Sequence, residues 1–157
     1  MILSMPDNMW FAIGFGTNMR NTDMIGWHAN GPDSYATDYY STKKSAPEPD
    51  AKQDIEYYFN LFDADEDDPD DYPRVHFLTY RDLDTGDAEQ DFNIELETEI
   101  DMVYGLYLAS SNWNEHTARG TFKMNFNSKL GVSSEFQKIG FEDEINVNAE
   151  PLEPDAP

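Results

Sequence analysis

Short runs of apolar and aromatic residues recur at short intervals along this chain, and turn-forming residues separate them. In several runs the apolar side chains alternate with polar ones, as at Ile55, Tyr57, Phe59 and Leu61. A period of two places every second side chain on the same face of a strand, so the pattern predicts strands with one buried face. Strands are predicted at residues 10–15, 24–29, 34–41, 54–61, 74–81, 92–96, 100–109 and 122–126, and an edge strand is predicted at 132–139.

Turn chemistry separates these strands and no segment has a convincing amphipathic helical period. Residues 30–33 read Asn-Gly-Pro-Asp and residues 84–87 read Asp-Thr-Gly-Asp, which are turn clusters. Many short strands joined by regular turns predict an all-β, antiparallel β-sandwich. The 157 residues suit one domain, expected over 1–147, with an acidic, proline-rich tail or linker at 148–157.

Charge narrows the range of partners. The chain has 32 Asp and Glu against 10 Lys and Arg, a formal net charge of −22. Such a surface repels nucleic acid and anionic lipid, so neither is an expected partner. No apolar run is long enough to cross a bilayer, which argues against direct membrane insertion. The acidic surface is compatible with solvation alone, with a calcium-rich surrounding or with a basic partner.

Recognisable catalytic motifs are missing from the sequence. There is no Gly-x-Ser-x-Gly, phosphate-binding loop or His-Glu-x-x-His, and no cysteine is present for disulfides or thiolate metal sites. The acidic run at 63–71 offers carboxylates to Ca²⁺ but fails the EF-hand spacing, so a solvated loop is favoured over a Ca²⁺ site. A structural metal site near strand ends is a second alternative, with four aspartates that the sequence does not rank: Asp7, Asp23, Asp38 and Asp87.

Five segments, in order, carry a resemblance to a known family. The first is residues 10–27, Trp-Phe-Ala-Ile-Gly-Phe-Gly-Thr-Asn-Met-Arg-Asn-Thr-Asp-Met-Ile-Gly-Trp. The others are Asp38-Tyr39-Tyr40-Ser41, Pro47 followed by Asp50, Arg81-Asp82-Leu83-Asp84-Thr85-Gly86-Asp87, and His116-Thr117-Ala118-Arg119-Gly120-Thr121-Phe122. Together they resemble DOMON domains, β-sandwich modules found beside dopamine monooxygenases, in the cytochrome part of cellobiose dehydrogenase and joined to membrane cytochromes b. The resemblance implies an immunoglobulin-like sandwich. Only nine residues precede Trp10, where the family has a strand or two, so an N-terminal edge strand is expected to be missing or supplied otherwise.

The resemblance also implies a cofactor and its ligands. Haem-binding members use one Met after the first glycine-rich turn and one His before the late Arg-Gly strand, and these positions match Met19 and His116. Without a Cys-x-x-Cys-His motif the haem is expected to be non-covalent, of the b type. Met/His ligation fills both axial positions, which implies electron transfer and not catalysis by this domain.

Further residues are assigned around this haem as expectations. The expected pocket walls are Trp10, Phe15, Met24, Tyr104, Trp113 and Phe122, and the expected propionate contacts are Arg20, Arg119 and Lys123. Each of these also has an ordinary interpretation, as core for the walls and as surface ion pairs for the cations. His28 and His76 match no family ligand position, so both are expected at a surface or interface.

The resemblance implies a redox protein or a membrane cytochrome as the partner, and the domain could be a subunit of a larger assembly. The implied compartment is extracellular, periplasmic or lumenal. The alternative functions are a haem-free carbohydrate-binding module, with Trp27, Tyr39, Tyr40 and Trp113 stacking on sugars, or a structural and adhesive module. Fold alone does not choose among these functions.

Overall fold

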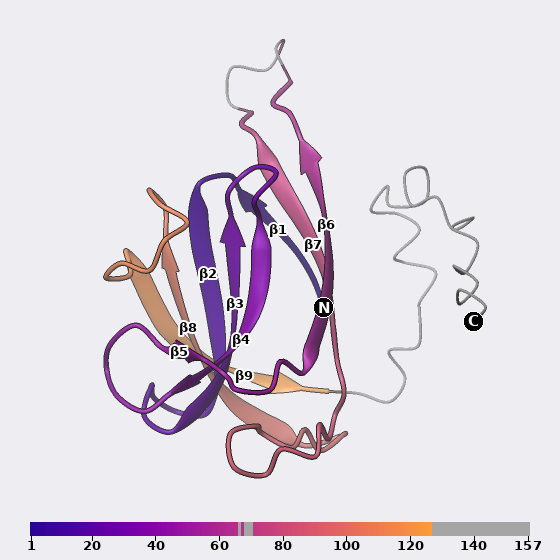
Figure 1. The fold of residues 1–157 in the computed structure, drawn as a ribbon, viewed down its shortest axis with the longest axis vertical. Coiled ribbons are helices and arrows are strands. Elements are labelled where there is room, and N and C mark those ends of the chain that lie inside the picture. Colours follow the sequence, from indigo (N-terminus) through magenta and orange to yellow (C-terminus); the bar gives the residue numbers. More distant parts are fainter. Residues whose placement is uncertain (66, 68–70, 127–157) are drawn as a thin grey trace, which may run out of the picture. The chain divides into compact units, whose positions relative to one another are not determined.

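The computed structural model describes residues 1–65, 67 and 71–126. Its strands form two antiparallel sheets that pack as a sandwich, and the described residues contain no helix (Figure 1). The prediction of an all-β antiparallel sandwich is confirmed. No helix able to cross a membrane occurs among these residues.

The larger sheet has six strands in the order β5-β4-β3-β2-β8-β9. Their bounds are β2 Met9–Phe15, β3 Thr22–Ala29, β4 Tyr35–Ser41, β5 Glu48–Pro49, β8 Glu99–Tyr107 and β9 Ala118–Asn125. β2 lies at its centre and pairs with β3 on one side and β8 on the other, so that Trp10 is opposite both His28 and Tyr107. The sheet therefore places β2, near the start of the chain, next to β8, which comes much later in the sequence.

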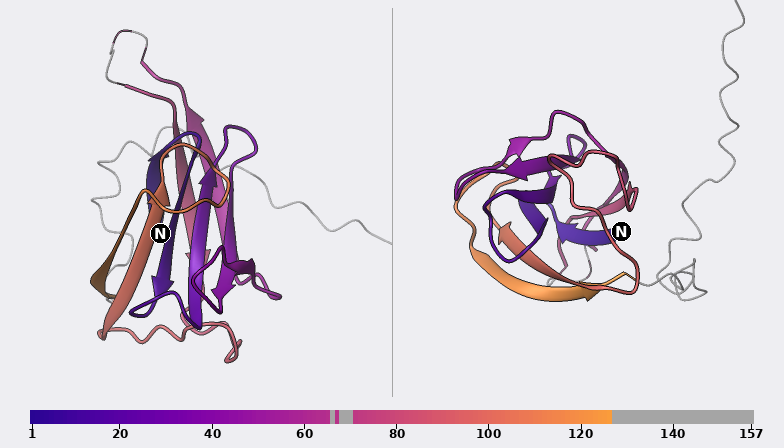
Figure 2. Two further views of the ribbon diagram at one scale, coloured as in Figure 1. Left: turned by 90° about the vertical axis from the view of Figure 1, so that its left-hand side faces the viewer. Right: turned by 90° about the horizontal axis from the view of Figure 1, so that it is seen from below.

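The smaller sheet has three strands in the order β1-β7-β6. Their bounds are β1 Ile2–Pro6, β6 Ile55–Phe62 and β7 Arg74–Arg81. In the left-hand view of Figure 2 the strands of both sheets run roughly vertically. Because β1 falls within the first nine residues and pairs with β7, the edge strand whose absence was expected is present in this chain.

The main hydrophobic core lies between the two sheets. It joins Val75 and Phe77 of the smaller sheet to Ile13, Ile25 and Trp27 of the larger one. Both Trp27 and Phe77 are 0% exposed, and the Trp27 indole Nε1 donates a 2.8 Å hydrogen bond to Thr79 Oγ1 across the sandwich. Burial of the alternating apolar side chains is what holds the two layers together.

One predicted strand is wrong. Residues 92–96 alternate as a strand would, but the structure places them in the long connection between β7 and β8. Their backbone donors bind elsewhere: Phe92 N donates to Asp23 Oδ2 at 2.7 Å and Ile94 N donates to the Leu83 carbonyl at 2.8 Å. Ile94 is nevertheless only 7% exposed, so burial produced the strand-like pattern without a strand. The edge strand predicted at 132–139, and the domain boundary predicted at 147, lie outside the described residues.

Candidate functional site

The six-stranded sheet has a second face, which points away from the main core. Along β2 the side chains of Trp10 and Ala12 lie on this face, while Ile13 lies on the other. Together with Met24 and Tyr39 they form a second buried apolar cluster. All eight residues of β3 are buried, which requires cover on both faces of the sheet. Loops supply that cover on the outer face.

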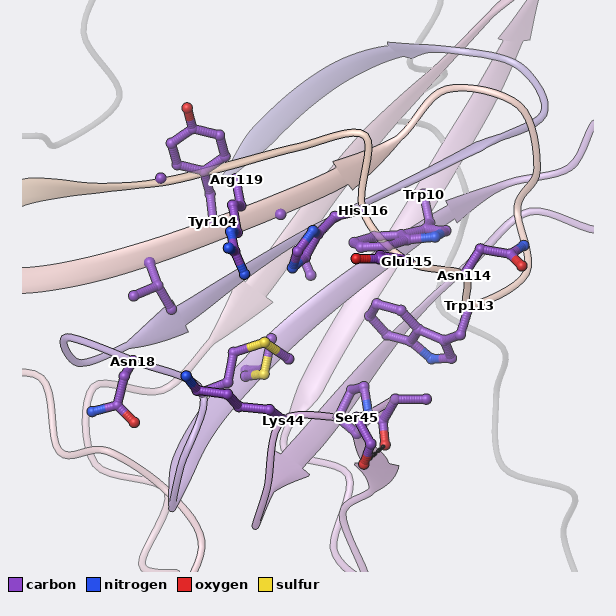
Figure 3. A pocket seen from close by; sticks show the side chains of 18 of the residues that line it. Trp10, Asn18, Lys44, Ser45, Tyr104, Trp113, Asn114, Glu115, His116 and Arg119 are labelled. Atoms are coloured by element: carbon purple, nitrogen blue, oxygen red, sulfur yellow. Dashed lines mark hydrogen bonds between the residues drawn. The ribbon is translucent and has the colours of Figure 1, made fainter.

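A cavity of about 840 Å³ lies between this face and the loops at residues 16–21, 42–47 and 108–117 (Figure 3). Its size falls within the range of roughly 300–1,000 Å³ typical of small-molecule and cofactor sites. Residues of the sheet that line it are Trp10, Ala12, Met24, Val103, Tyr104, Gly105, Arg119, Gly120 and Thr121. Residues of the loops that line it are Thr17, Asn18, Met19, Lys44, Ser45, Ala46, Pro47, Trp113, Asn114, Glu115 and His116.

Small residues keep the sheet side of the cavity open. A Cβ atom on Gly105 would lie 3.4 Å from His116 Cδ2 and 3.5 Å from Trp10 Cη2. The glycine therefore lets both rings lie close to the backbone of β8. Ala12 on the neighbouring strand β2, paired with Gly105, likewise presents little side chain. A larger residue at position 105 would grow into the space beside His116.

Met19 and His116 line this same cavity, although they come from different loops. Met19 follows β2 and packs against the outer cluster that contains Trp10 and Met24. His116 precedes β9, and the backbone beside it is fixed by a 2.7 Å hydrogen bond from Thr117 N to the Leu106 carbonyl. Both side chains are partly buried, and among the described residues the His116 ring has no hydrogen-bond partner. The cavity is thus lined by the Met19 thioether and by the His116 imidazole, which is free to bind a ligand.

The expected wall residues divide between the two faces of the sheet. Trp10, Met24, Tyr104 and Trp113 line the cavity, and the rings of Trp10 and Trp113 lie 4.5 Å apart, centroid to centroid. The ring of Tyr104 packs over Gly120 and also contacts the main core. Phe15 and Phe122 lie elsewhere: strand alternation turns both toward the core between the sheets, where Phe15 stacks on Phe92.

The cations also divide. Arg119 lines the cavity, and Figure 3 shows its guanidinium beside His116. Lys123 instead pairs with Glu99 at 2.6 Å on the exposed side of β9, and Arg20 is exposed and does not line the cavity. Lys44 lines the cavity and was missed by the sequence analysis. Its signal in the sequence was the pair Lys43-Lys44, one residue beyond the strand predicted at 34–41, in a chain poor in cations.

The expectation that His28 lies at a surface or interface is wrong, because its side chain is 0% exposed beneath the β8–β9 loop. Its Nδ1 lies 2.5 Å from the Ser111 carbonyl oxygen, which can only accept, so the ring proton is on Nδ1. Nε2 then accepts from the Tyr39 hydroxyl at 3.1 Å. Burial lowers the pKa of His28 and raises the pKa of Tyr39 to about 12, so both stay neutral. His28 therefore fixes the loop that carries Trp113 and His116.

His76 lies on β7 of the smaller sheet, whereas His28 and the cavity belong to the six-stranded sheet. Its ring is partly buried and lies 4.1 Å from that of Phe62, centroid to centroid. Burial lowers its pKa, with a smaller effect of the Arg74 charge in the same direction.

Comparison with known families decides what kind of domain this is. The family model for the DOMON domain matches residues 1–107, more than half of the chain. The chain belongs to the DOMON family. No curated protein sequence matches it significantly. Among solved structures, this DOMON domain is similar to the cytochrome domain of Myriococcum thermophilum cellobiose dehydrogenase, with a TM-score of 0.56 and 10% identity. That match covers 87% of this chain and 70% of the other.

A second similar structure is the cytochrome b domain of pyranose dehydrogenase from Coprinopsis cinerea. Its TM-score is 0.49 with 10% identity, over 78% of this chain and 65% of the other.

Two aspartates of the motif segments lie together with a third aspartate at a second place in this DOMON domain, away from the cavity lining. Asp23 on β3, Asp38 on β4 and Asp91 in the β7–β8 connection each offer an oxygen within 4.8 Å of the others. Arg81 Nη2 lies 2.6 Å from Asp23 Oδ2 and 3.6 Å from Asp91 Oδ2. Asp23 and Asp38 are two of the four unranked aspartates that the sequence offered for a structural metal site, whereas Asp91 was not among them.

Burial makes this cluster electrostatically costly. It raises the pKa of Asp23 to about 6 against the opposing effect of Arg81. It raises the pKa of Asp38 to about 7, and the neighbouring charges of Asp23 and Asp91 act in the same direction. A single guanidinium thus does not compensate the carboxylates that surround it.

The other acidic candidates have local roles. Asp7 accepts backbone hydrogen bonds from Asn8 and Gly31, and Asp87 accepts from Glu89 and Gln90. In the acidic loop at 63–71, described in part, the carboxylate of Asp71 accepts from Asp65 N. The described residues of this loop form no cluster with metal-ligand spacing.

Proposed function

We propose that this DOMON domain is an electron-transfer domain that holds a haem between Met19 and His116. One observation carries the proposal: these two side chains, far apart in the sequence, line one cavity whose walls are largely apolar. A neutral thioether and a neutral imidazole are an established axial pair for haem iron. The structural likeness to a cytochrome domain of cellobiose dehydrogenase supports it independently of the residues.

The residues present fit a non-covalent, b-type haem. The chain has no cysteine, so no thioether link to the macrocycle can form. When bound, the haem would supply a one-electron redox couple. Met19 and His116 would both bind the iron and leave no position open for a substrate, so this domain would serve an oxidoreductase without being catalytic itself.

The remaining lining has two tasks. Trp10, Met24 and Trp113 exclude water and provide apolar contact for a planar ring system. Lys44 and Arg119 are the cations at this cavity among the described residues, and they suit the two carboxylates of the propionates. We assign the propionate contacts to them in preference to Arg20 and Lys123, which do not line the cavity.

The partner we propose is another redox protein or a membrane cytochrome, within a larger assembly or as a separate chain. The likeness to a domain of a dehydrogenase supports such a partner. We also propose a compartment outside the cytosol for this domain, extracellular, periplasmic or lumenal.

The carbohydrate-binding alternative loses two of its four aromatic residues. Trp27 is 0% and Tyr39 is 4% exposed, so neither ring can stack on a sugar. Trp113 is partly buried against Trp10 at the cavity. We therefore favour haem for this cavity.

A haem titration tests the proposal. The apo protein should bind one haem per chain, give sharp visible bands on reduction, and leave the reduced spectrum unchanged under carbon monoxide because both axial positions are occupied. A protein that stays colourless with excess haem would overturn the proposal. A reduced spectrum that shifts fully with carbon monoxide would show an open axial position and contradict the electron-transfer assignment.

A further inference from the structure

A buried carboxylate cluster lies where β3 and β4 of the six-stranded sheet meet the β7–β8 connection, and it plays no part in the proposed haem site. The cluster consists of Asp23, Asp38, Asp50, Asp91 and Arg81. Asp23 and Asp38 lie on the paired strands β3 and β4, where Asp38 is opposite Ile25 and Asp23 is opposite Tyr40. The strand pairing therefore fixes the separation of these two side chains.

Asp38 is the member of the cluster whose carboxylate lacks a partner in the described part of the chain. Its side chain is 0% exposed, and neither carboxylate oxygen has a hydrogen-bond partner among the described residues. A buried carboxylate without hydrogen bonds costs several kcal/mol of stability unless something compensates it. One of its oxygens lies within 4.8 Å of oxygens of Asp23 and Asp91, so it faces the centre of the cluster.

The charges of the cluster do not balance. The side chains of Asp23 and Asp91 are each 3% exposed and that of Arg81 is 5% exposed, so solvent screens none of them well. With Asp38, three carboxylates face one guanidinium, which leaves two negative charges. Asp50, 5% exposed with Oδ2 unpartnered, adds to the same field. A divalent cation would neutralise the residual charge of the three.

One oxygen from each of the three aspartates lies within 4.8 Å of the others, which is close enough for all three to bind a single ion. Carboxylate oxygens suit hard divalent cations. Ca²⁺ binds oxygens at roughly 2.3–2.6 Å in a flexible geometry, whereas Mg²⁺ demands near-ideal octahedral geometry at roughly 2.0–2.1 Å. Carboxylates whose positions are set by two strands and a connection therefore suit Ca²⁺ better. We propose that Asp23, Asp38 and Asp91 bind one Ca²⁺ ion.

The consequence is structural. Asp91 belongs to the β7–β8 connection, whose Phe92 backbone already donates to Asp23. An ion shared by Asp23, Asp38 and Asp91 fastens this connection to β3 and β4, and so holds Phe92 against Phe15 in the main core. The site is distinct from the cavity of Met19 and His116.

Calorimetric and thermal titrations of CaCl₂ into the full chain, after removal of metal with a chelator, test this inference. About 0.15 M salt screens loose binding to the acidic surface. We expect one site per chain and a Tm increase on the order of 10 °C at a free Ca²⁺ concentration about one hundred times Kd. MgCl₂ should bind at least about tenfold more weakly. A Tm that does not respond to Ca²⁺ would overturn the proposal, because the cluster would then be neutralised by protons.

Matched variants locate the site. Asp38→Asn should abolish the Ca²⁺-dependent rise in Tm. Asp91→Asn should abolish it too, and because Asp91 lies outside the strands, this variant tests the site if Asp38→Asn does not fold. Asp67→Asn, an equivalent change in the exposed acidic loop, should leave binding unchanged. Binding that survives Asp91→Asn but is lost in Asp67→Asn would place the ion in the loop and contradict the proposal.

Discussion

At the scale of single residues, the cavity depends on how little side chain the sheet presents at position 105. A Cβ there would meet His116 and Trp10 at 3.4 and 3.5 Å, which is ordinary van der Waals contact. Anything longer would have to enter the cavity. Gly105 is thus the residue at which cavity volume can be altered without changing a proposed ligand.

Gly105→Leu should lower the affinity for haem by about 10- to 100-fold, because the added side chain fills space that the cofactor needs. Gly105→Ala adds only the Cβ and should change affinity by less than about threefold. Haem titration of both variants measures the difference. Equal affinities for Gly105→Leu and the native protein would show that the cofactor binds elsewhere.

His28 gives the fold a pH dependence of known sign. Burial lowers its folded-state pKa, so below about pH 6.5 the unfolded chain binds a proton that the native chain does not. The contribution of His28 to stability is therefore complete above pH 6.5 and is lost as the pH falls. The free energy of unfolding of the native protein relative to His28→Gln should decline by about 1.4 kcal/mol per pH unit below that point.

Urea unfolding of both proteins from pH 7.5 to 5 measures this difference. Tyr39→Phe, which removes the donor to His28 Nε2, should reduce the total decline, because the ring loses a bond specific to its neutral form and its folded-state pKa moves closer to the unfolded value. A difference that is constant with pH would contradict the assigned tautomer and burial.

At this scale the sequence predicted which residues line the cavity only in part. Met19 and His116 were assigned from the resemblance, and Trp10, Met24, Tyr104, Trp113 and Arg119 were expected around the haem from their residue types; all seven line one cavity. Phe15 and Phe122 were assigned too, but which face an aromatic residue occupies depends on strand register, which residue type does not reveal. His28 was misjudged for a related reason. Its face of β3 is covered by a loop from residues 108–117, and a sequence pattern does not show where a distant loop packs.

At the scale of elements, the two faces of the six-stranded sheet have separate tasks. The inner face packs on the smaller sheet, where Met5 of β1 is 2% exposed in the main core. The outer face carries the cavity. Changes to one face should therefore be separable from changes to the other.

Met5→Ala should reduce the free energy of unfolding by about 2–5 kcal/mol, because it leaves a cavity between the sheets. Haem affinity of the folded variant should stay within about twofold of the native value. Leu61→Ala on β6, where the side chain is 47% exposed, is the matched control and should cost less than about 0.5 kcal/mol. Urea titrations with and without haem separate the two effects; a large loss of haem affinity in Met5→Ala would contradict the independence of the faces.

Strand prediction succeeded where alternation coincided with backbone pairing. β2, β3, β4, β6, β7, β8 and β9 all correspond to predicted segments. It failed at residues 92–96, where a carboxylate and a loop carbonyl take the backbone donors. β1 was not predicted because Ile2–Pro6 is short and ends in proline, which an edge strand tolerates.

At the scale of the whole molecule, the net charge of −22 is the property most relevant to a partner. Long-range attraction would accelerate encounter with a basic redox protein and slow encounter with an acidic one. Both effects are screened within a Debye length, which is about 8 Å at physiological salt.

Electron transfer from the reduced domain to a basic acceptor protein should slow by at least about tenfold between 0.01 and 0.2 M ionic strength. Transfer to an acidic acceptor of similar potential should accelerate or stay constant. Stopped-flow absorbance measures both rates. A basic acceptor whose rate is independent of salt would show that the acidic surface has no part in recognition.

The assignment of Met19 and His116 as haem ligands is the central claim, and the visible spectrum of matched variants tests it most directly. In the reduced, haem-loaded protein, Met19→Leu and His116→Gln should each convert the sharp low-spin bands to a high-spin spectrum. Met24→Leu, at the same cavity, and His76→Gln, on the other sheet, should keep the native spectrum. A low-spin spectrum that persists in Met19→Leu and His116→Gln, or one that is lost in Met24→Leu instead, would contradict the assignment.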